Sequence, residues 1–226
     1  MIYSLNMPII KILIHKDWYL LRKIIAIYVV GALFALSFIS LGEWQFFMGT
    51  TLLISMLIGL GNHQINNTII NERKEHTLPF VMSLPITPID YVVAKLIANM
   101  SLFVIPWFII SAMTIAVFWF TAVPNGVVPL SVILGLYFLL CYCVTWAAGM
   151  ISESEGVVLF VMIFMNCMIG PIIYTVTRFK EISQYIFGDT PVWSIQAVSI
   201  IIFQLLVILL AVTCAFYSQA RKKTFL

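Results

Sequence analysis

Six long apolar runs constrain this chain more than any other feature of its sequence. None of them contains Asp, Glu, Lys or Arg, and hydrophobic residues make up 62% of the 226 residues. A helix of about 18 to 20 apolar residues crosses the roughly 30 Å hydrocarbon core of a bilayer. We therefore expect an all-α polytopic membrane protein, a single domain over residues 1–226. Its six transmembrane helices would be residues 24–41, 44–61, 96–121, 127–151, 157–177 and 194–217.

The distribution of basic residues predicts which side of the membrane each loop faces. Cytoplasmic loops and tails carry an excess of Lys and Arg. With the amino terminus inside, ten of the twelve basic residues are cytoplasmic, and only Arg178 and Lys180 are external. An even number of spans then places both termini in the cytoplasm. The net charge of +3 follows from basic residues that flank spans, so it does not point to a nucleic-acid partner.

Residues 8–22, before the first run, have the pattern of an amphipathic helix. Lys11, His15 and Arg22 fall within about 40° of one another on a helical wheel, and apolar side chains occupy the other side. Such a helix lies in the membrane interface with its basic face toward the headgroups. Asp17 interrupts the apolar face, so we expect it to have a partner. Two roles stay open: a generic anchor, or an elbow helix that helps to bind a cytoplasmic subunit.

The cytoplasmic loop between the second and third runs, residues 71–93, concentrates charge. The helical pattern of the second run continues to Ile70, so the loop starts directly from a membrane helix. At its other end, Thr87, Pro88 and Asp90 predict a helix start with an N-cap, a first-turn proline and a capping-box acid. These signals favour a charged knob of fixed shape over a solvated linker that only reverses the chain.

The same loop has a charged cluster followed by Thr-Leu, an apolar stretch and Ser-Leu-Pro-Ile, and about ten residues later an Ala-Lys begins the next span. The residues of this pattern are Glu72, Thr77, Leu78, Ser83, Leu84, Pro85, Ile86, Ala94 and Lys95. In this pattern, and in the order of elements along the chain, the sequence resembles the permease subunits of ABC-2 type transporters. The family often has Gly before the Thr and a basic residue soon after the Leu-Pro, whereas this chain has His76 at the first position and Thr87 and Pro88 at the second.

This resemblance implies a division of labour between two kinds of subunit. The chain would form half of a transmembrane pathway in the bacterial plasma membrane, beside a second permease subunit that is identical or homologous. A separate ABC ATPase would bind ATP and Mg²⁺, because this sequence has no GxxxxGK[ST] phosphate loop. We expect no cofactor or metal on the chain itself. The residues that contact the ATPase would be Glu72, Arg73, Lys74, Glu75, His76 and Thr77.

Two further features concern the spans and the external side. Pro106 and Pro171 each remove a backbone hydrogen bond and predict kinks in their helices. Residues 178–190 predict a short external helical element, because Phe179, Ile182 and Ile186 follow helical spacing. By the resemblance, this element would be a gate at the top of the pathway; an ordinary amphipathic loop is the alternative.

The function that these patterns favour is ATP-driven export by a non-enzymatic permease. No charged residue lines any run, so an apolar or amphipathic substrate such as a peptide, antibiotic, lipid-like molecule or drug fits best. A membrane-embedded enzyme needs paired carboxylates, an HExxH helix or a nucleophile with its base at depth, which we do not find. A secondary transporter is expected to carry a midplane ionisable residue and internal repeats, and we find neither in this sequence. An accessory membrane anchor of a larger complex stays open.

Overall fold

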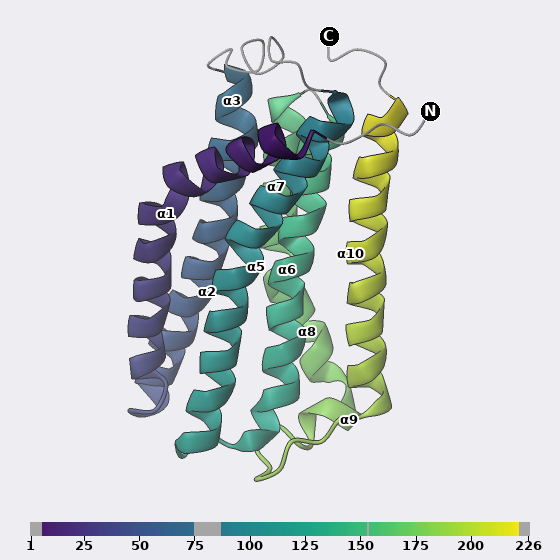
Figure 1. Cartoon of the computed structure of the whole chain (residues 1–226). Coiled ribbons are helices and arrows are strands. Elements are labelled where there is room, and N and C mark those ends of the chain that lie inside the picture. The colour runs from purple at the N-terminus through teal and green to yellow at the C-terminus, as the bar shows by residue number, and fades with distance from the viewer. Residues whose placement is uncertain (1–5, 75–86, 153, 222–226) are drawn as a thin grey trace.

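The protein is a bundle of long helices that run side by side (Figure 1). The computed structural model describes residues 6–74, 87–152 and 154–221, and every regular element in these ranges is a helix. Six helical segments are long and apolar enough to cross a membrane, and each predicted apolar run falls on one of them, which confirms the predicted number. The segments are Met7–Phe38, Glu43–Ile70, Ile89–Phe120, Asn125–Ile151, Glu155–Arg178 and Ile195–Gln219.

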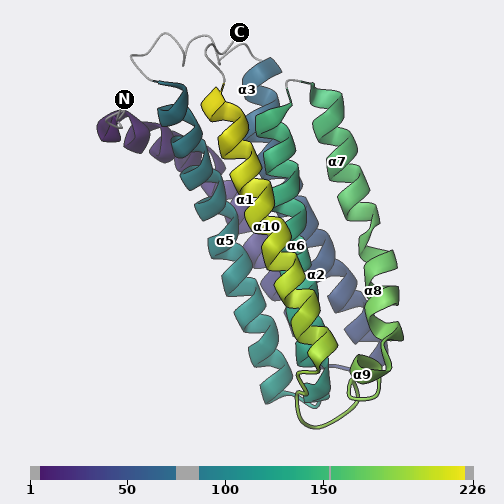
Figure 2. The same cartoon turned by 90° about the vertical axis from the view of Figure 1, so that its right-hand side faces the viewer.

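The central helix of the bundle is α6, Val128–Ile151. It packs against α10 (Ile195–Arg221) and α7 (Glu155–Cys167), and it also contacts α2 (Glu43–Ile65) and α5 (Pro88–Phe120). Half of its most apolar stretch is buried (50%), compared with 11% for the last candidate span, so α6 forms the core and α10 lies at the surface. Figure 2 shows α7 along one side of the bundle and α10 in front of α6.

One continuous helix, α1 (Met7–Phe38), replaces the separate interfacial helix and first span that the sequence predicted. Its first turns lie across the end of the bundle, and the rest of the helix then runs along it (Figure 1). No Gly or Pro interrupts the chain between the two parts, so the helix has no local reason to stop. In the first part, Leu13 and Leu21 are buried, whereas the predicted basic residues Lys11, His15 and Arg22 are exposed.

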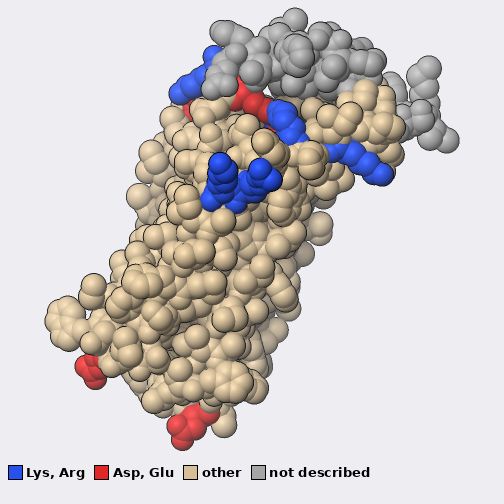
Figure 3. All heavy atoms as spheres, turned by 60° about the vertical axis from the view of Figure 1, so that its left-hand side comes forward, with Lys and Arg blue, Asp and Glu red and all other residues tan. Residues whose placement is uncertain are grey.

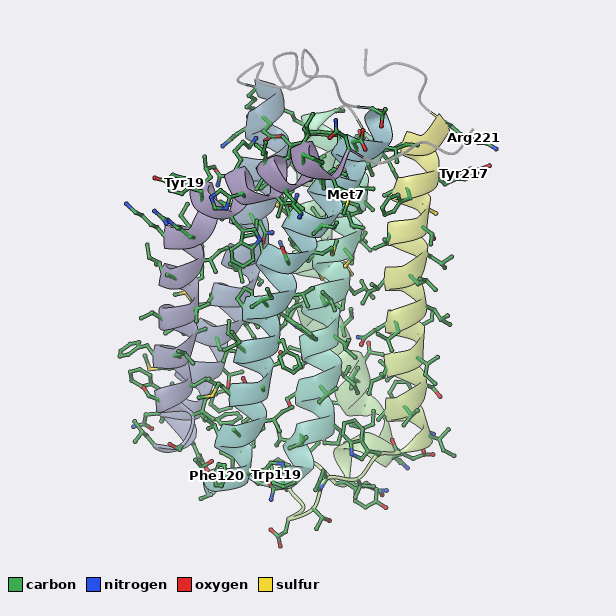
Figure 4. All side chains as sticks on the ribbon, in the orientation of Figure 1. Met7, Tyr19, Trp119, Phe120, Tyr217 and Arg221 are labelled. Atoms are coloured by element: carbon green, nitrogen blue, oxygen red, sulfur yellow. The ribbon has the colours of Figure 1, made fainter. Side chains whose placement is uncertain are left out.

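The two described ends of the chain lie at the same end of the bundle, as an even number of spans requires. Met7 and Arg221 lie there, while Trp119 and Phe120 lie at the opposite end (Figure 4). We call these the terminal end and the far end. On the face shown in Figure 3, basic side chains gather toward the terminal end and the far end carries acidic ones. The uncharged stretch between them matches the charge-free runs of the sequence.

The second span continues past α2 through a π-helical turn, η1 (Asn66–Ile70), into α3 (Asn71–Lys74). This confirms that the charged segment starts directly from a membrane helix. The start of α5 has the predicted capping box: Thr87 Oγ1 accepts the backbone N–H of Asp90, and Asp90 Oδ2 accepts the backbone N–H of Thr87. The backbone N–H of Asn6 also donates to the Asp90 carboxylate, at 3.0 Å. The beginnings of α1 and α5 are therefore tied together.

The two prolines inside the spans have different outcomes. The helix α5 continues through Pro106 to Phe120. The fifth span instead breaks, because α7 ends at Cys167 and α8 extends over Ile169–Arg178. Pro171 has no N–H to bond the Cys167 carbonyl, and its ring clashes with that group.

The segment that the sequence predicted to be external and helical, residues 178–190, contains one short helix, α9 (Lys180–Ser183). Ile182 is buried against Ile133 and Val176, whereas Phe179 is exposed and Ile186 is half-buried. The segment is also tied to the 3-10 turn η2, Asn125–Val127, by a 2.8 Å bond from the Gly126 N–H to the Gly188 carbonyl. A Cβ atom at Gly126 would lie 1.8 Å from the Tyr185 carbonyl oxygen, so this close approach requires glycine.

Candidate functional site

Four charged side chains meet at the terminal end of the bundle, and we call them the ionic cluster: Lys16 and Asp17 of α1, Glu72 of α3 and Lys95 of α5. Lys95 Nζ lies 2.9 Å from Asp17 Oδ2 and 2.8 Å from Glu72 Oε1. Lys16 Nζ lies 2.6 Å from the same Glu72 oxygen and 3.6 Å from Asp17 Oδ1. The cluster therefore joins three segments that are distant in the sequence.

The helical register places these charges inside the bundle. Asp17 follows Leu13 and precedes Leu21 on the buried face of α1, at spacings of one helical turn. Lys95 lies between Ala94 and Ala98 on α5, both of which are buried. Such small side chains let α1 approach α5 closely. A charge at either position must therefore find its partner on the neighbouring helix.

Burial makes the pairing within the ionic cluster obligatory. Asp17 and Lys95 are each 3% exposed and Glu72 is 8% exposed. A buried ion without a partner is very costly, whereas two lysines and two carboxylates balance one another. Burial by itself would raise the pKa of Glu72, but the nearby charge of Lys95 and the hydrogen bond from Lys16 outweigh it and hold the pKa below the ordinary 4.5. Glu72 is thus held in its ionised form. Its other oxygen accepts the Tyr91 hydroxyl at 3.3 Å.

A second group of polar side chains, the amide network, lies one turn further along α5. It consists of Gln64, Thr68, Asn99 and Tyr142. The residues Gln64, Thr68 and Asn99 are each at most 2% exposed. Gln64 Nε2 and the Tyr142 hydroxyl both donate to the Asn99 carbonyl, at 2.7 and 2.9 Å. Thr68 donates to the Asn99 side chain at 2.6 Å, and that side chain donates to the Lys95 carbonyl at 2.9 Å. Polar contacts therefore continue from the ionic cluster through α5 to α2 and α6.

The structure separates the residues that the sequence grouped as ATPase contacts. Glu72 faces inward and belongs to the ionic cluster, because its carboxylate meets Lys16 and Lys95. Lys74 is exposed and pairs with Glu155 at the start of α7, with 3.0 Å between Nζ and Oε2. Glu75, His76, Thr77 and the side chain of Arg73 lie outside the described residues, as do Leu78 and residues 83–86.

Sequence reasoning found only part of this site. Asp17 was expected to need a partner, and the structure identifies that partner as Lys95. The roles of Lys16, Tyr91 and the amide network were missed. The available signal was the presence of polar residues such as Gln64 and Asn99 in helices that are otherwise apolar, since polar groups in a membrane helix usually face the bundle interior.

The arrangement is suited to holding helices together. In the described part of the chain, no three His, Cys, Asp or Glu side chains gather in a way that would hold a metal ion. The buried ion pairs instead make α1, α3 and α5 one mechanical unit at the terminal end.

Comparisons with protein-family models, with curated proteins and with solved structures found no match to this chain.

Proposed function

We propose that this chain is the membrane-spanning permease subunit of an ATP-driven ABC exporter, with an apolar or amphipathic substrate. In this proposal it pairs with a second permease subunit in the bacterial plasma membrane, and a separate ABC ATPase docks on its terminal end. The observation that carries the proposal is the ionic cluster, which fastens the charged segment α3 to α1 and α5. A loop that only reversed the chain would have no use for buried ion pairs to two other helices.

The ionic cluster gives a physical route from an ATPase to the membrane helices. The segment α3 continues from α2 through η1 without a flexible linker. A force on α3 therefore moves α2 directly, and it moves α1 and α5 because the Glu72–Lys95 and Lys95–Asp17 pairs resist separation in a buried setting. Rigid-body movement of packed helices is one of the known ways in which a binding event at one end changes a pathway at the other.

The proposed class of substrate follows from the apolar character of the spans. Between the two ends, the candidate spans carry large exposed hydrophobic side chains, including Ile27 on α1, Phe160 on α7 and Phe203 on α10. A strongly charged solute would find no charged partner in this region, since the paired charges of the ionic cluster lie at the terminal end. A molecule with a substantial apolar part suits this environment better.

The first test is co-purification from cells. A tagged copy of the chain should retain a nucleotide-hydrolysing subunit whose ATPase rate changes when the permease is present. Reconstituted vesicles with both subunits should then export substrate only with ATP. If the chain alone transports, or if no such subunit is retained under mild detergent conditions, the proposal is wrong.

A charge-swap experiment tests the docking surface. Lys74→Glu should weaken association with the ATPase about tenfold, because an exposed charge at an interface is reversed. Glu155→Lys is the matched control, since it breaks the same 3.0 Å ion pair within the chain and leaves Lys74 in place. The double variant Lys74→Glu/Glu155→Lys restores the ion pair with the two charges exchanged, and its association with the ATPase should remain weak. Full association of Lys74→Glu would contradict a docking role for α3, and recovery in the double variant would assign the loss to the internal pair.

A further inference from the structure

A small cavity lies inside the membrane region, between α2, α5, α6 and α7. Its volume is about 20 Å³, enough for at least one group the size of a water molecule. Phe138, Cys141 and Tyr142 of α6 form part of its apolar wall, and Ile58 of α2 lines it from the side. The polar side chains that line it are Asn62, Thr145 and Asn166, together with the Tyr142 phenol.

Two amide side chains join across this cavity. Asn166 Nδ2 of α7 donates to Asn62 Oδ1 of α2 at 3.1 Å. Both residues are half-buried, so the cavity reaches the surface of the bundle beside them. Asn166 lies near the middle of the candidate span Glu155–Arg178. A polar amide at that depth is costly unless it is paired, and the pairing partner can be another side chain or a ligand.

The backbone next to Asn166 is irregular, because the break between α7 and α8 follows two residues later. The Met165 carbonyl accepts the Tyr137 hydroxyl at 2.7 Å and lies 3.7 Å from Cys141 Sγ. Gly170, two residues beyond the break, is exposed, and no atom of another helix lies within 4 Å of the position that a Cβ would occupy there. At membrane depth, a broken helix is tolerated where it is buried or lines a cavity, and broken helices of transporters often form the substrate site.

We propose that this cavity binds an uncharged hydroxyl or amide group of an amphipathic ligand, whose apolar part lies along the lipid-facing side of α7. Of the described residues that line the cavity, none carries a charge, which disfavours an ionic head group. Asn62 and Asn166 supply donors and acceptors in a largely apolar surrounding, as small-molecule sites usually do. Phe160, Ile163 and Phe164 are exposed nearby on α7 and provide an apolar surface. The identification of this ligand as the exported molecule rests on the proposed function.

Photolabelling of the full-length chain in nanodiscs tests the site without an ATPase. The probe is dodecanamide with a diazirine on its alkyl chain, and labelled residues are located by peptide mass spectrometry. We expect saturable labelling of residues beside the cavity, competed by unlabelled dodecanamide and dodecanol but not by dodecane or dodecanoate. Labelling spread evenly over lipid-facing positions, or insensitive to these competitors, would overturn the proposal.

The double variant Asn62→Leu/Asn166→Leu should reduce saturable labelling about tenfold, because both amides that bind the head group are lost. Replacing both partners avoids leaving one amide unpaired. Thr175→Val is the matched control, since Thr175 is exposed on α8 and its hydroxyl donates to the Pro171 carbonyl of the same helix. Saturable labelling of the Thr175→Val variant should equal that of the original chain. Equal labelling of the double variant would count against the site.

A second variant keeps the test decisive if the double variant does not fold. Ile58→Phe enlarges a half-buried residue at the cavity wall and leaves the Asn62–Asn166 pair intact. We expect it to lose the saturable labelling by filling the space, and unchanged labelling would contradict the site.

Two sources of the ligand can be told apart by mass spectrometry of molecules extracted with the original chain but not with the double variant. A neutral glycerolipid would assign the site to a bilayer lipid, and a peptide-like molecule would assign it to cargo. Because none of these measurements uses the ATPase, failure of the site and failure of the exporter proposal give different results.

Discussion

The ammonium group of Lys95 shows how one residue can hold several helices. It is 3% exposed and lies within 3 Å of both the Asp17 and the Glu72 carboxylates. Lys16, the other cation of the ionic cluster, has a side chain that is 43% exposed. Lys95 is therefore the partner on which the buried carboxylates mainly depend, and Lys16 completes the balance of charge from the surface.

Replacing Lys95 by Met should lower the free energy of unfolding by about 3–5 kcal/mol, because two buried carboxylates would then share Lys16. Thermal or denaturant unfolding of the purified chain in detergent measures the change. Lys23→Met is the control, since Lys23 is exposed at the same end, and its effect should stay within about 0.5 kcal/mol. Asp17→Asn/Lys95→Met should recover much of the loss. Equal stability of Lys95→Met and Lys23→Met would show that the ionic cluster contributes little.

At the level of elements, the fifth span differs from the other candidate spans of the described chain because it consists of two separate α-helices, α7 and α8. Three residues before the break, the Met165 carbonyl accepts the Tyr137 hydroxyl of α6. Asn166, the next residue, is bonded to α2. The end of α7 is thus attached to two neighbouring helices, whereas the start of α8 has open space at Gly170.

Tyr137→Phe should therefore weaken the attachment of α7 to α6 next to the break, because it removes the bond to the Met165 carbonyl and leaves the packed volume almost unchanged. Loss of the hydroxyl is expected to cost about 0.5–1.5 kcal/mol in the free energy of unfolding. Hydrogen exchange should become faster for the backbone amides of Met168, Ile169, Gly170 and Ile172, while α6 keeps its protection. Tyr217→Phe, at an exposed tyrosine of α10, is the control and should change neither quantity. Unchanged exchange around the break in Tyr137→Phe would mean that the hydroxyl does not restrain it.

At the level of the whole molecule, the bundle has two chemically different ends joined by an uncharged middle. Basic side chains gather toward the terminal end on the face of Figure 3, and the described termini lie at that end in Figure 1. The excess of basic residues predicts that the terminal end faces the cytoplasm. The docking proposed above requires this orientation, because ATP is available on that side.

Cysteine labelling of intact cells tests the orientation. Phe187→Cys places a thiol at a residue that is 84% exposed near the far end, and Lys23→Cys places one at an exposed residue of the terminal end. A membrane-impermeant maleimide added outside should modify the first variant and not the second, which should react only after the cells are opened. The original chain controls for its own cysteines. The reverse pattern would invert the topology and remove the basis for docking of an ATPase at the terminal end.

The sequence by itself determined the elements that depend on local chemistry. Six charge-free runs predicted six membrane-length helices, because the requirement for apolar residues applies to each span separately. Thr87 and Asp90 predicted the start of α5 for the same reason, since a capping box involves only neighbouring residues. The break at Pro171 also follows from a local clash, whereas α5 continues as one helix past Pro106.

Only the tertiary structure decided which polar residues meet. Glu72 was expected to face a partner protein, but it faces Lys16 and Lys95 instead. The residues joined by the Lys16–Glu72, Lys95–Asp17 and Asn166–Asn62 bonds are 56, 78 and 104 positions apart in the chain. Such pairs depend on which helices pack together and in which rotation. In a bilayer, apolar side chains are satisfied equally well by lipid or by protein, so apolar patterning leaves that choice open.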